Sequence, residues 1–86
     1  MRLPPPVLAL SPGTLAPGDA AAFLARVLRC REQGLRGVVL RERALSDRDY
    51  LALASAVRVA LPRDSGGWLA VHDRPHLALA AEADAH

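Results

Sequence analysis

The sequence predicts an α/β fold with parallel strands in a single small domain. Three short apolar runs, at residues 7–10, 37–40 and 68–71, have the composition of buried strands. Between them lie two segments in which apolar residues recur at helical spacing. Strands that alternate with helices in this way are joined by right-handed crossovers and run parallel. A chain of 86 residues is long enough for one such domain, over residues 1–86, and its core must be thin.

The first strand is predicted at residues 7–10, where an apolar run stops at Ser11-Pro12-Gly13. Its lack of polar positions is typical of a strand that is buried on both faces. The next helix is predicted to begin at Asp19, because a carboxylate accepts hydrogen bonds from the free N–H groups of a helix start. Its apolar pattern ends at Gly34.

The second strand, Gly37-Val38-Val39-Leu40, runs directly into the charged residues Arg41-Glu42-Arg43. Ser46 and Asp49 form a capping box at the start of the second helix, which stops at Pro62. The apolar stripe of this helix consists of Tyr50, Leu53, Ala54, Val57 and Leu61.

The third strand, at residues 68–71, follows a turn at 64–67 and ends in His72-Asp73-Arg74-Pro75. The pattern from His76 to Ala83 predicts the start of a third helix. Glu82, Asp84 and His86 are expected to belong to a fraying terminus.

Composition excludes several classes of protein. A single cysteine, Cys30, excludes an internal disulfide and favours a reducing, cytoplasmic location. Prolines interrupt the start of the chain where a signal peptide needs an apolar run, and no stretch approaches the roughly 20 apolar residues of a membrane span. The formal charge is +2, but the arginines alternate with acidic residues and form no basic cluster. We therefore expect neither a nucleic-acid nor a membrane partner.

Polar residues that follow the strands are the candidates for function. In parallel α/β folds the carboxyl ends of the strands face the ligand. Period-two alternation places Arg41 and Arg43 on one side of the second strand and Glu42 on the other. Two guanidinium groups at one strand end suit a phosphate or diphosphate, or else they only solvate the strand end.

Asp73 has two interpretations. Its carboxylate is suited to a Mg²⁺ ion that bridges phosphates, since this ion takes one or two carboxylates and keeps several waters. Alternatively, Asp73 caps the helix that begins near Pro75. A transition-metal site formed with His72 and His76 is disfavoured, because the three side chains face different directions across the junction of strand and helix.

Three stretches carry a resemblance to a known family, the thiamine-phosphate synthases and their thiazole-tautomerase (TenI-like) relatives. Residues 38–46, Val-Val-Leu-Arg-Glu-Arg-Ala-Leu-Ser, are similar to the family's strand-two pattern Gln-Leu-Arg-Glu-Lys and the helix start after it. Residues 71–80 resemble its strand-three pattern Asn-Asp-Arg followed by a short apolar helix, and residues 83–85 resemble the start of its fourth strand. The resemblance implies the first three βα units of a TIM (β/α)8 barrel: strands one to three, helices one and two, and the start of helix three.

The resemblance also implies an activity. The family is a transferase in thiamine biosynthesis that joins hydroxymethylpyrimidine diphosphate to thiazole phosphate and releases pyrophosphate with Mg²⁺. Carried over, Arg41, Arg43 and His72 hold the diphosphate and Asp73 is a Mg²⁺ ligand. This sequence has Val39 in place of the family glutamine, Arg43 in place of its lysine and His72 in place of its asparagine. These departures leave a tautomerase-type paralogue as an alternative.

A barrel of this family needs eight strands and a phosphate site in its last two βα loops. We therefore expect this chain to be an N-terminal fragment that is not catalytic alone, and to associate with itself or with a chain that carries the missing C-terminal portion. The alternative from another class is a non-catalytic interaction module whose open strand edges, on the first and third strands, pair with a partner chain.

Overall fold

The computed structural model describes residue 5 and residues 8–86. Its elements, in chain order, are β1 (Leu8–Leu10), the 3-10 helix η1 (Pro17–Asp19), α1 (Ala20–Glu32), β2 (Gly37–Leu40), α2 (Asp47–Ala60), the 3-10 helix η2 (Arg63–Ser65), β3 (Trp68–Val71) and α3 (Pro75–Ala78). Within these residues, no helix combines the length and the apolar character that crossing a membrane requires.

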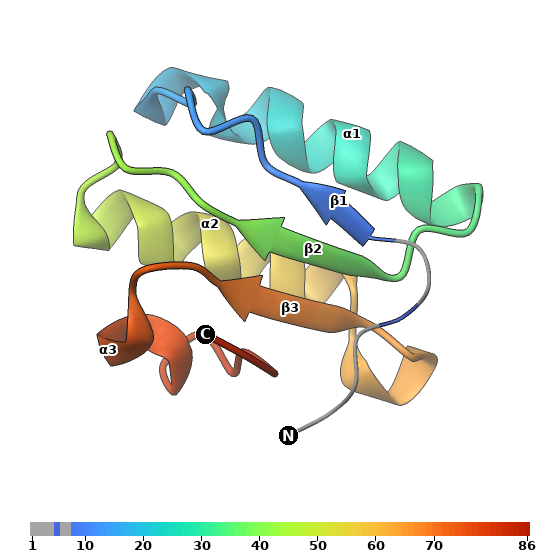
Figure 1. Cartoon of the computed structure of the whole chain (residues 1–86). Coiled ribbons are helices and arrows are strands. Elements are labelled where there is room, and N and C mark those ends of the chain that lie inside the picture. The colour runs from blue at the N-terminus through green and yellow to red at the C-terminus, as the bar shows by residue number, and fades with distance from the viewer. Residues whose placement is uncertain (1–4, 6–7) are drawn as a thin grey trace.

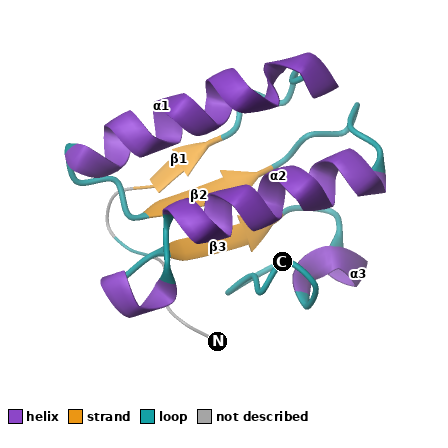
Figure 2. Ribbon diagram, turned by 180° about the vertical axis from the view of Figure 1, so that it is seen from behind, coloured by secondary structure: helices purple, strands orange, loops and turns teal. Residues whose placement is uncertain are grey.

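The three strands form one parallel sheet in the order β1-β2-β3 (Figure 1). The two long helices, α1 and α2, cover the same face of this sheet (Figure 2). This arrangement confirms the predicted α/β fold with parallel strands. It follows from right-handed crossovers between strands that are neighbours in both sequence and space, since each crossover then places its helix on the same side.

The predicted bounds of β2 and β3 are confirmed to the residue, and those of α1 and α2 to within two residues. Strand β1 is described from Leu8, and Val7, the predicted first residue of this strand, lies outside the described part of the chain. The Ser46 half of the predicted capping box at α2 is also confirmed, because the Ser46 hydroxyl accepts a hydrogen bond of 3.1 Å from the N–H group of Asp49.

The capping prediction at α1 is wrong. Asp19 makes no side-chain cap to this helix, and its carboxylate instead accepts a hydrogen bond of 2.9 Å from the N–H group of Ala16. The 3-10 turn η1 directly precedes α1, so the helical segment begins one turn earlier than Asp19. The acidic residue therefore closes η1 rather than starting α1.

The core lies between the sheet and the two helices. Val38, Leu40, Leu69 and Val71 point from β2 and β3 toward the helices and are fully buried. The predicted stripe of α2 is confirmed, since all five of its residues are buried in the same cluster. Alternate positions of two strands and one stripe of one helix supply most of this core.

The face of the sheet opposite the helices is covered unevenly, so the prediction that the first strand is buried on both faces is wrong. Leu8 and Leu10 are 41% and 59% exposed. Next to Leu8 lies Gly37, where a Cβ atom would come within 2.6 Å of the Leu8 side chain and 2.9 Å of the Pro5 ring. These two side chains therefore cover the amino-terminal end of the face, and Leu10 is left open.

The predicted third helix is shorter than expected. Helix α3 ends at Ala78 and turns follow, with the N–H group of Ala83 bonded to the carbonyl of Ala78. Glu82 adopts a left-handed backbone with φ of 55°, which ends helical progression and is unusual for a residue with a side chain. The chain then returns to β3, where Ala85 forms a parallel bridge with Ala70. This bridge occupies part of the β3 edge that was predicted to be open.

Asp84 does not belong to a fraying terminus, which corrects the prediction for this segment. Its fully buried carboxylate accepts hydrogen bonds of 2.8 Å from Arg58 and 2.9 Å from Arg63, and another from the N–H group of Leu69. Arg58 is buried as well and donates to the carbonyls of Leu61, Gly67 and Glu82. The ion pair fastens the last residues to α2 and β3.

We expect Asp84→Asn to destabilise the fold by about 3–5 kcal/mol, because the charge of Arg58 would stay buried without its counter-ion. Urea unfolding followed by the fluorescence of Trp68, the single tryptophan, measures the change. Asp64→Asn on the exposed turn η2 is the matched control and should change stability by less than about 0.5 kcal/mol. Equal stabilities of the two variants would contradict a structural role for the buried pair.

Tyr50 joins α2 to the carboxyl end of β2. Its fully buried hydroxyl donates a hydrogen bond of 2.7 Å to the carbonyl of Leu40. Burial raises the pKa of Tyr50 to about 12, although the guanidinium of Arg74, 4.2 Å above the ring, acts in the opposite direction. Folding therefore favours the protonated phenol.

The sign of the pH dependence follows from this raised pKa. The contribution of Tyr50 to stability should be complete below about pH 10, the pKa of an unfolded tyrosine, and should be lost as the pH rises toward 12. Ultraviolet titration reports this group alone, because Tyr50 is the single tyrosine. Tyr50→Phe should cost about 1 kcal/mol at pH 8 and weaken the fall in stability between pH 10 and 12. An ordinary titration midpoint near pH 10 in the folded protein would contradict the burial.

Candidate functional site

The carboxyl ends of the strands surround a hollow of about 220 Å³ that is lined by Gly13, Arg41, Arg43 and His72. The three charged or titratable side chains come from the ends of two neighbouring strands, and Gly13 comes from the loop after β1. The structure thus brings together the three residues that the sequence proposed for diphosphate binding. Two guanidinium groups and one imidazole in one place favour an anionic ligand.

Strand alternation explains how Glu42 is kept out of this hollow. The Glu42 side chain points to the opposite side and is only 2% exposed. Its two carboxylate oxygens accept hydrogen bonds of 2.6 Å from the N–H group of Gly13 and 2.7 Å from that of Leu15. Gly13 reaches this position with a φ of 86°, a conformation that glycine adopts without steric cost. Glu42 therefore fixes the loop between β1 and α1.

Ser11 adds a second tie between the same strands. Its buried hydroxyl accepts a hydrogen bond of 2.9 Å from the N–H group of Arg41, and its own N–H group donates to the carbonyl of Val39. Ser11 thus ties the backbone of Arg41 to the loop after β1, one residue beyond the last paired residues of β1 and β2.

Arg74 holds the other side of the site, a role that the sequence did not predict. One of its terminal nitrogens donates to the carbonyls of Glu42 and Leu45 at 2.7 and 2.6 Å, and the other donates to Asp47 at 2.9 Å. The guanidinium also stacks on the ring of Tyr50. Arg74 therefore orders the loop between β2 and α2. In the sequence, the only indication of this role was the position of Arg74 directly before Pro75, the first residue of α3.

Asp73 lies at the rim of the hollow. Its carboxylate is 3.8 Å from the guanidinium of Arg43 and 3.3 Å from the imidazole of His72. The alternative role as a helix cap is not observed, because the N-cap residue of α3 is Arg74 and the helix has no side-chain cap. The Asp73 backbone has a φ of 62°, which Asp tolerates better than most residues. Asp73 therefore belongs to the charged cluster of the site.

The residues of the site can hold Mg²⁺ only together with a bound phosphate ligand that supplies further oxygen atoms to the ion. Glu42 is nearby, but both of its oxygens are taken by backbone N–H groups, which leaves Asp73 as the carboxylate at the rim. In the described part of the chain, no group of three or more His, Cys, Asp or Glu side chains is arranged to hold a metal. One carboxylate with phosphate oxygens and water completes a magnesium shell.

His76 lies apart from His72 and Asp73, as the sequence indicated. Its ring is 3.0 Å from the carboxylate of Asp47 at the start of α2. This hydrogen bond is the main cause that lowers the pKa of Asp47, with a smaller contribution from Arg74. His76 thus joins the start of α3 to the start of α2 on the rim of the molecule.

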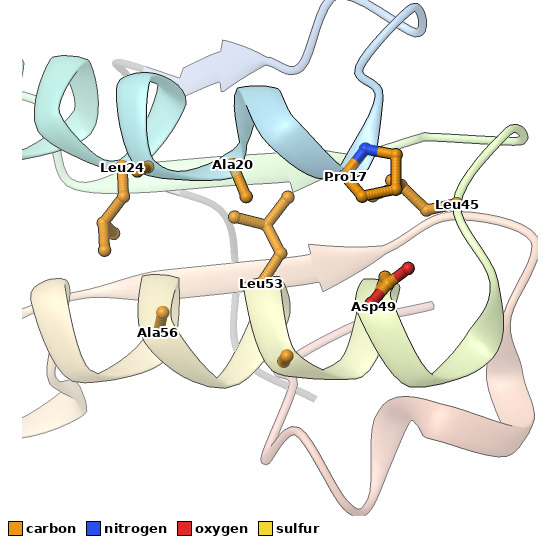
Figure 3. Close-up of a pocket in the computed structure, with 9 residues that line it drawn as sticks. Pro17, Ala20, Leu24, Leu45, Asp49, Leu53 and Ala56 are labelled. Atoms are coloured by element: carbon orange, nitrogen blue, oxygen red, sulfur yellow. The ribbon is translucent and has the colours of Figure 1, made fainter.

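A second hollow lies between α1 and α2 and is mainly apolar (Figure 3). Small alanines on the two helices leave a space of about 210 Å³, and Leu24 and Leu53 project into it. Asp49 is the single charged residue in its lining. This hollow carries no set of converging polar groups, so the chemistry of the protein is better placed at the strand ends.

Comparison of the chain with protein-family models, with curated proteins and with solved structures finds no match in any of the three.

We expect Glu42→Gln to destabilise the fold by about 1–3 kcal/mol. An amide presents one oxygen and one NH₂ group to two N–H donors, so one donor loses its partner inside the protein. Urea unfolding measures the change, and amide exchange at Gly13 and Leu15 should become faster. Glu32→Gln at the exposed end of α1 removes the same charge and should leave both quantities unchanged. Unchanged exchange in the Glu42 variant would contradict the proposed tie.

Proposed function

We propose that this protein binds the phosphate or diphosphate group of a small organic molecule in the hollow at the carboxyl ends of β2 and β3. The single observation that carries the proposal is the convergence of Arg41, Arg43 and His72 around one space of about 220 Å³. The two guanidinium charges outnumber the single negative charge of the Asp73 carboxylate at the rim. Guanidinium groups match phosphate oxygens in charge and in geometry.

The finer proposal is a thiamine-phosphate-synthase-like barrel domain in which these strands are the first three. The sheet order β1-β2-β3 with both long helices on one face is the arrangement that a (β/α)8 barrel needs. The parallel bridge of Ala85 to β3 is consistent with the start of a fourth strand. The sequence resemblance at residues 38–46 and 71–80 supports the same proposal.

In this proposal Arg41 and Arg43 grip the diphosphate of a phosphorylated pyrimidine, and His72 donates a hydrogen bond to one of its oxygens. Asp73 takes part in holding Mg²⁺, which would supply positive charge to neutralise the departing pyrophosphate. The hydrogen bond between Gly13 and Glu42 fixes the positions of the strand ends in the absence of the ligand, so the site is preorganised. A thiazole-tautomerase activity is the alternative within the family. A cytoplasmic location belongs to the same proposal.

A second candidate function, a module that completes its sheet with a partner chain, is favoured by the β1 side of the sheet. In the described residues β1 pairs only with β2, and Leu8 and Leu10 are exposed beside its free edge. Parallel strands are normally covered on both faces, so this side favours association. Sedimentation of the protein at micromolar concentration tests this candidate, and a folded monomer would count against it.

The proposed phosphate site predicts that Arg41→Ala weakens pyrophosphate binding by about tenfold or more, because charge-assisted hydrogen bonds are lost. Titration of the intact chain followed by NMR or calorimetry measures the affinity. Arg48→Ala on the exposed start of α2 removes the same charge away from the hollow and should change the affinity less than about twofold.

Two outcomes separate the coarse proposal from the fine one. Absence of pyrophosphate binding in the parent chain, or equal affinities in the Arg41 and Arg48 variants, would overturn the phosphate site itself. Binding of hydroxymethylpyrimidine diphosphate that is no tighter than that of pyrophosphate would instead count against the synthase-like function and leave the phosphate site in place.

A further inference from the structure

A separate hollow of about 350 Å³ lies at the amino-terminal end of the sheet, between the chain that joins α1 to β2 and the chain that joins α2 to β3 (Figure 1). Its lining consists of Arg31, Arg36, Leu61, Pro62, Ser65 and Gly67. None of these residues belongs to a strand, so the hollow does not depend on whether the sheet is open or is closed into a barrel. Strand β2 separates Arg36 from Arg41 of the proposed phosphate site by about 16 Å of extended chain.

Hydrogen bonds to the carboxyl ends of the two helices hold both arginines at this hollow. A terminal nitrogen of Arg31 donates to the carbonyl of Ala60, the last residue of α2, at 2.8 Å. A terminal nitrogen of Arg36 donates to the carbonyls of Arg31 and Leu35 at 3.3 and 3.1 Å. Capping the helix ends in this way uses one nitrogen of each guanidinium group, and among the described residues the other nitrogens have no partner. Each arginine is therefore held in place with donors left for a ligand.

The positive charge of the hollow is not balanced by a neighbouring carboxylate. Within residue 5 and residues 8–86, neither Arg31 nor Arg36 forms an ion pair, and no residue of the lining is acidic. Glu32 and Asp64 are the closest acidic residues in the sequence, and both are exposed and lie outside the lining. Two guanidinium groups without a carboxylate favour a ligand that carries two negative charges.

The chain after α2 bounds the hollow with backbone and small side chains. At Gly67 a Cβ atom would overlap the carbonyl group of Leu61, so the turn packs against this carbonyl through bare backbone. Gly66 makes the turn possible with a φ of 82°. Ser65 adds a hydroxyl group to the lining, and Leu61 and Pro62 add apolar atoms. The hollow thus combines charge, one neutral polar group and an apolar wall, as sites for small organic molecules do.

We infer that this hollow is a second anion site, which binds a phosphate monoester of a small organic molecule. A phosphate monoester carries nearly two negative charges and three terminal oxygen atoms, so Arg31, Arg36 and the Ser65 hydroxyl each have an acceptor. A volume of about 350 Å³ leaves room for the esterified body beside Leu61 and Pro62. The inference is independent of the proposed phosphate site, because the two hollows share no residue.

The test is a titration of the intact chain followed by NMR, which reports each end of the sheet separately. Backbone amides of residues 65–67 report the second site, and those of Gly13 and His72 report the proposed phosphate site. The probes are ribose 5-phosphate, ribose, which lacks the phosphate group, and succinate, which carries two charges on carboxylates. All are compared at the same ionic strength, because screening changes the affinity of exposed arginines.

Ribose 5-phosphate is expected to shift the amides of residues 65–67 in a saturable way, whereas ribose should leave them unchanged. Succinate should bind at least about fivefold more weakly, because its two carboxylates cannot present three oxygen atoms at one point.

Variants of Arg36 test the charge. Arg36→Ala should weaken the binding seen at residues 65–67 about tenfold and leave the affinity seen at Gly13 and His72 unchanged. Arg36→Gln keeps a neutral donor for the end of α1 and should show the same loss. Arg29→Ala, on the exposed last turn of α1, removes an equal charge and should change the affinity less than about twofold. The dispersion of each spectrum shows that the variant is folded.

The outcomes separate the two sites. Shifts at Gly13 and His72 without shifts at residues 65–67 would overturn the second site and leave the proposed phosphate site in place. Shifts at residues 65–67 alone would support the second site and count against the first, and a spectrum without shifts would overturn both. The inference also fails if Arg36→Ala binds as the parent chain does, or if succinate binds as tightly as ribose 5-phosphate.

Discussion

The buried carboxylate of Glu42 is the interaction on which the site depends most. Its two oxygens hold the N–H groups of Gly13 and Leu15, so the loop after β1 is fixed to the strand end of β2. The two donors also replace the hydrogen bonds to water that this carboxylate loses on burial. Since neighbouring residues on an extended chain point in opposite directions, anchoring Glu42 inward also directs Arg41 and Arg43 outward.

The second constraint is that both long helices lie on the same face of the sheet, which leaves the other face without a helix of this length. The large core cluster lies on the helix-covered face, whereas on the other face packing is closest around Gly37 and Trp68 and leaves Leu10 exposed. That face carries apolar groups in its middle and charged groups at its carboxyl end.

Where a residue's neighbours are close in sequence, the sequence was sufficient to predict the structure. The apolar run of β2, the stripe of α2 and the Ser46 cap depend on contacts within one element, and each was confirmed. Asp84 was misjudged because its partner Arg58 lies 26 positions earlier in the chain, and no local pattern reveals such a pair. The third helix was predicted too long, because turns follow Ala78 and Glu82 adopts a left-handed backbone that is rarely expected of a glutamate. In the site, alternation predicted the shared side of Arg41 and Arg43, whereas the bonds of Arg74 to the next loop depended on the tertiary fold.

Hydrogen bonds hold the frame of the site, whereas the side chains proposed to bind the ligand are exposed. Glu42, Ser11 and Arg74 are held by hydrogen bonds to backbone groups of other segments. The side chain of Arg43 is 90% exposed, and its contact with Asp73 is long. Ordering a free arginine side chain costs up to about 2 kcal/mol, so a ligand must form several charge-assisted bonds to offset it. An anion with many oxygens, such as a diphosphate, can do so, whereas a single carboxylate offers too few acceptors. In the proposed phosphate site, the cost of ordering the exposed Arg43 side chain therefore favours phosphate groups over carboxylates.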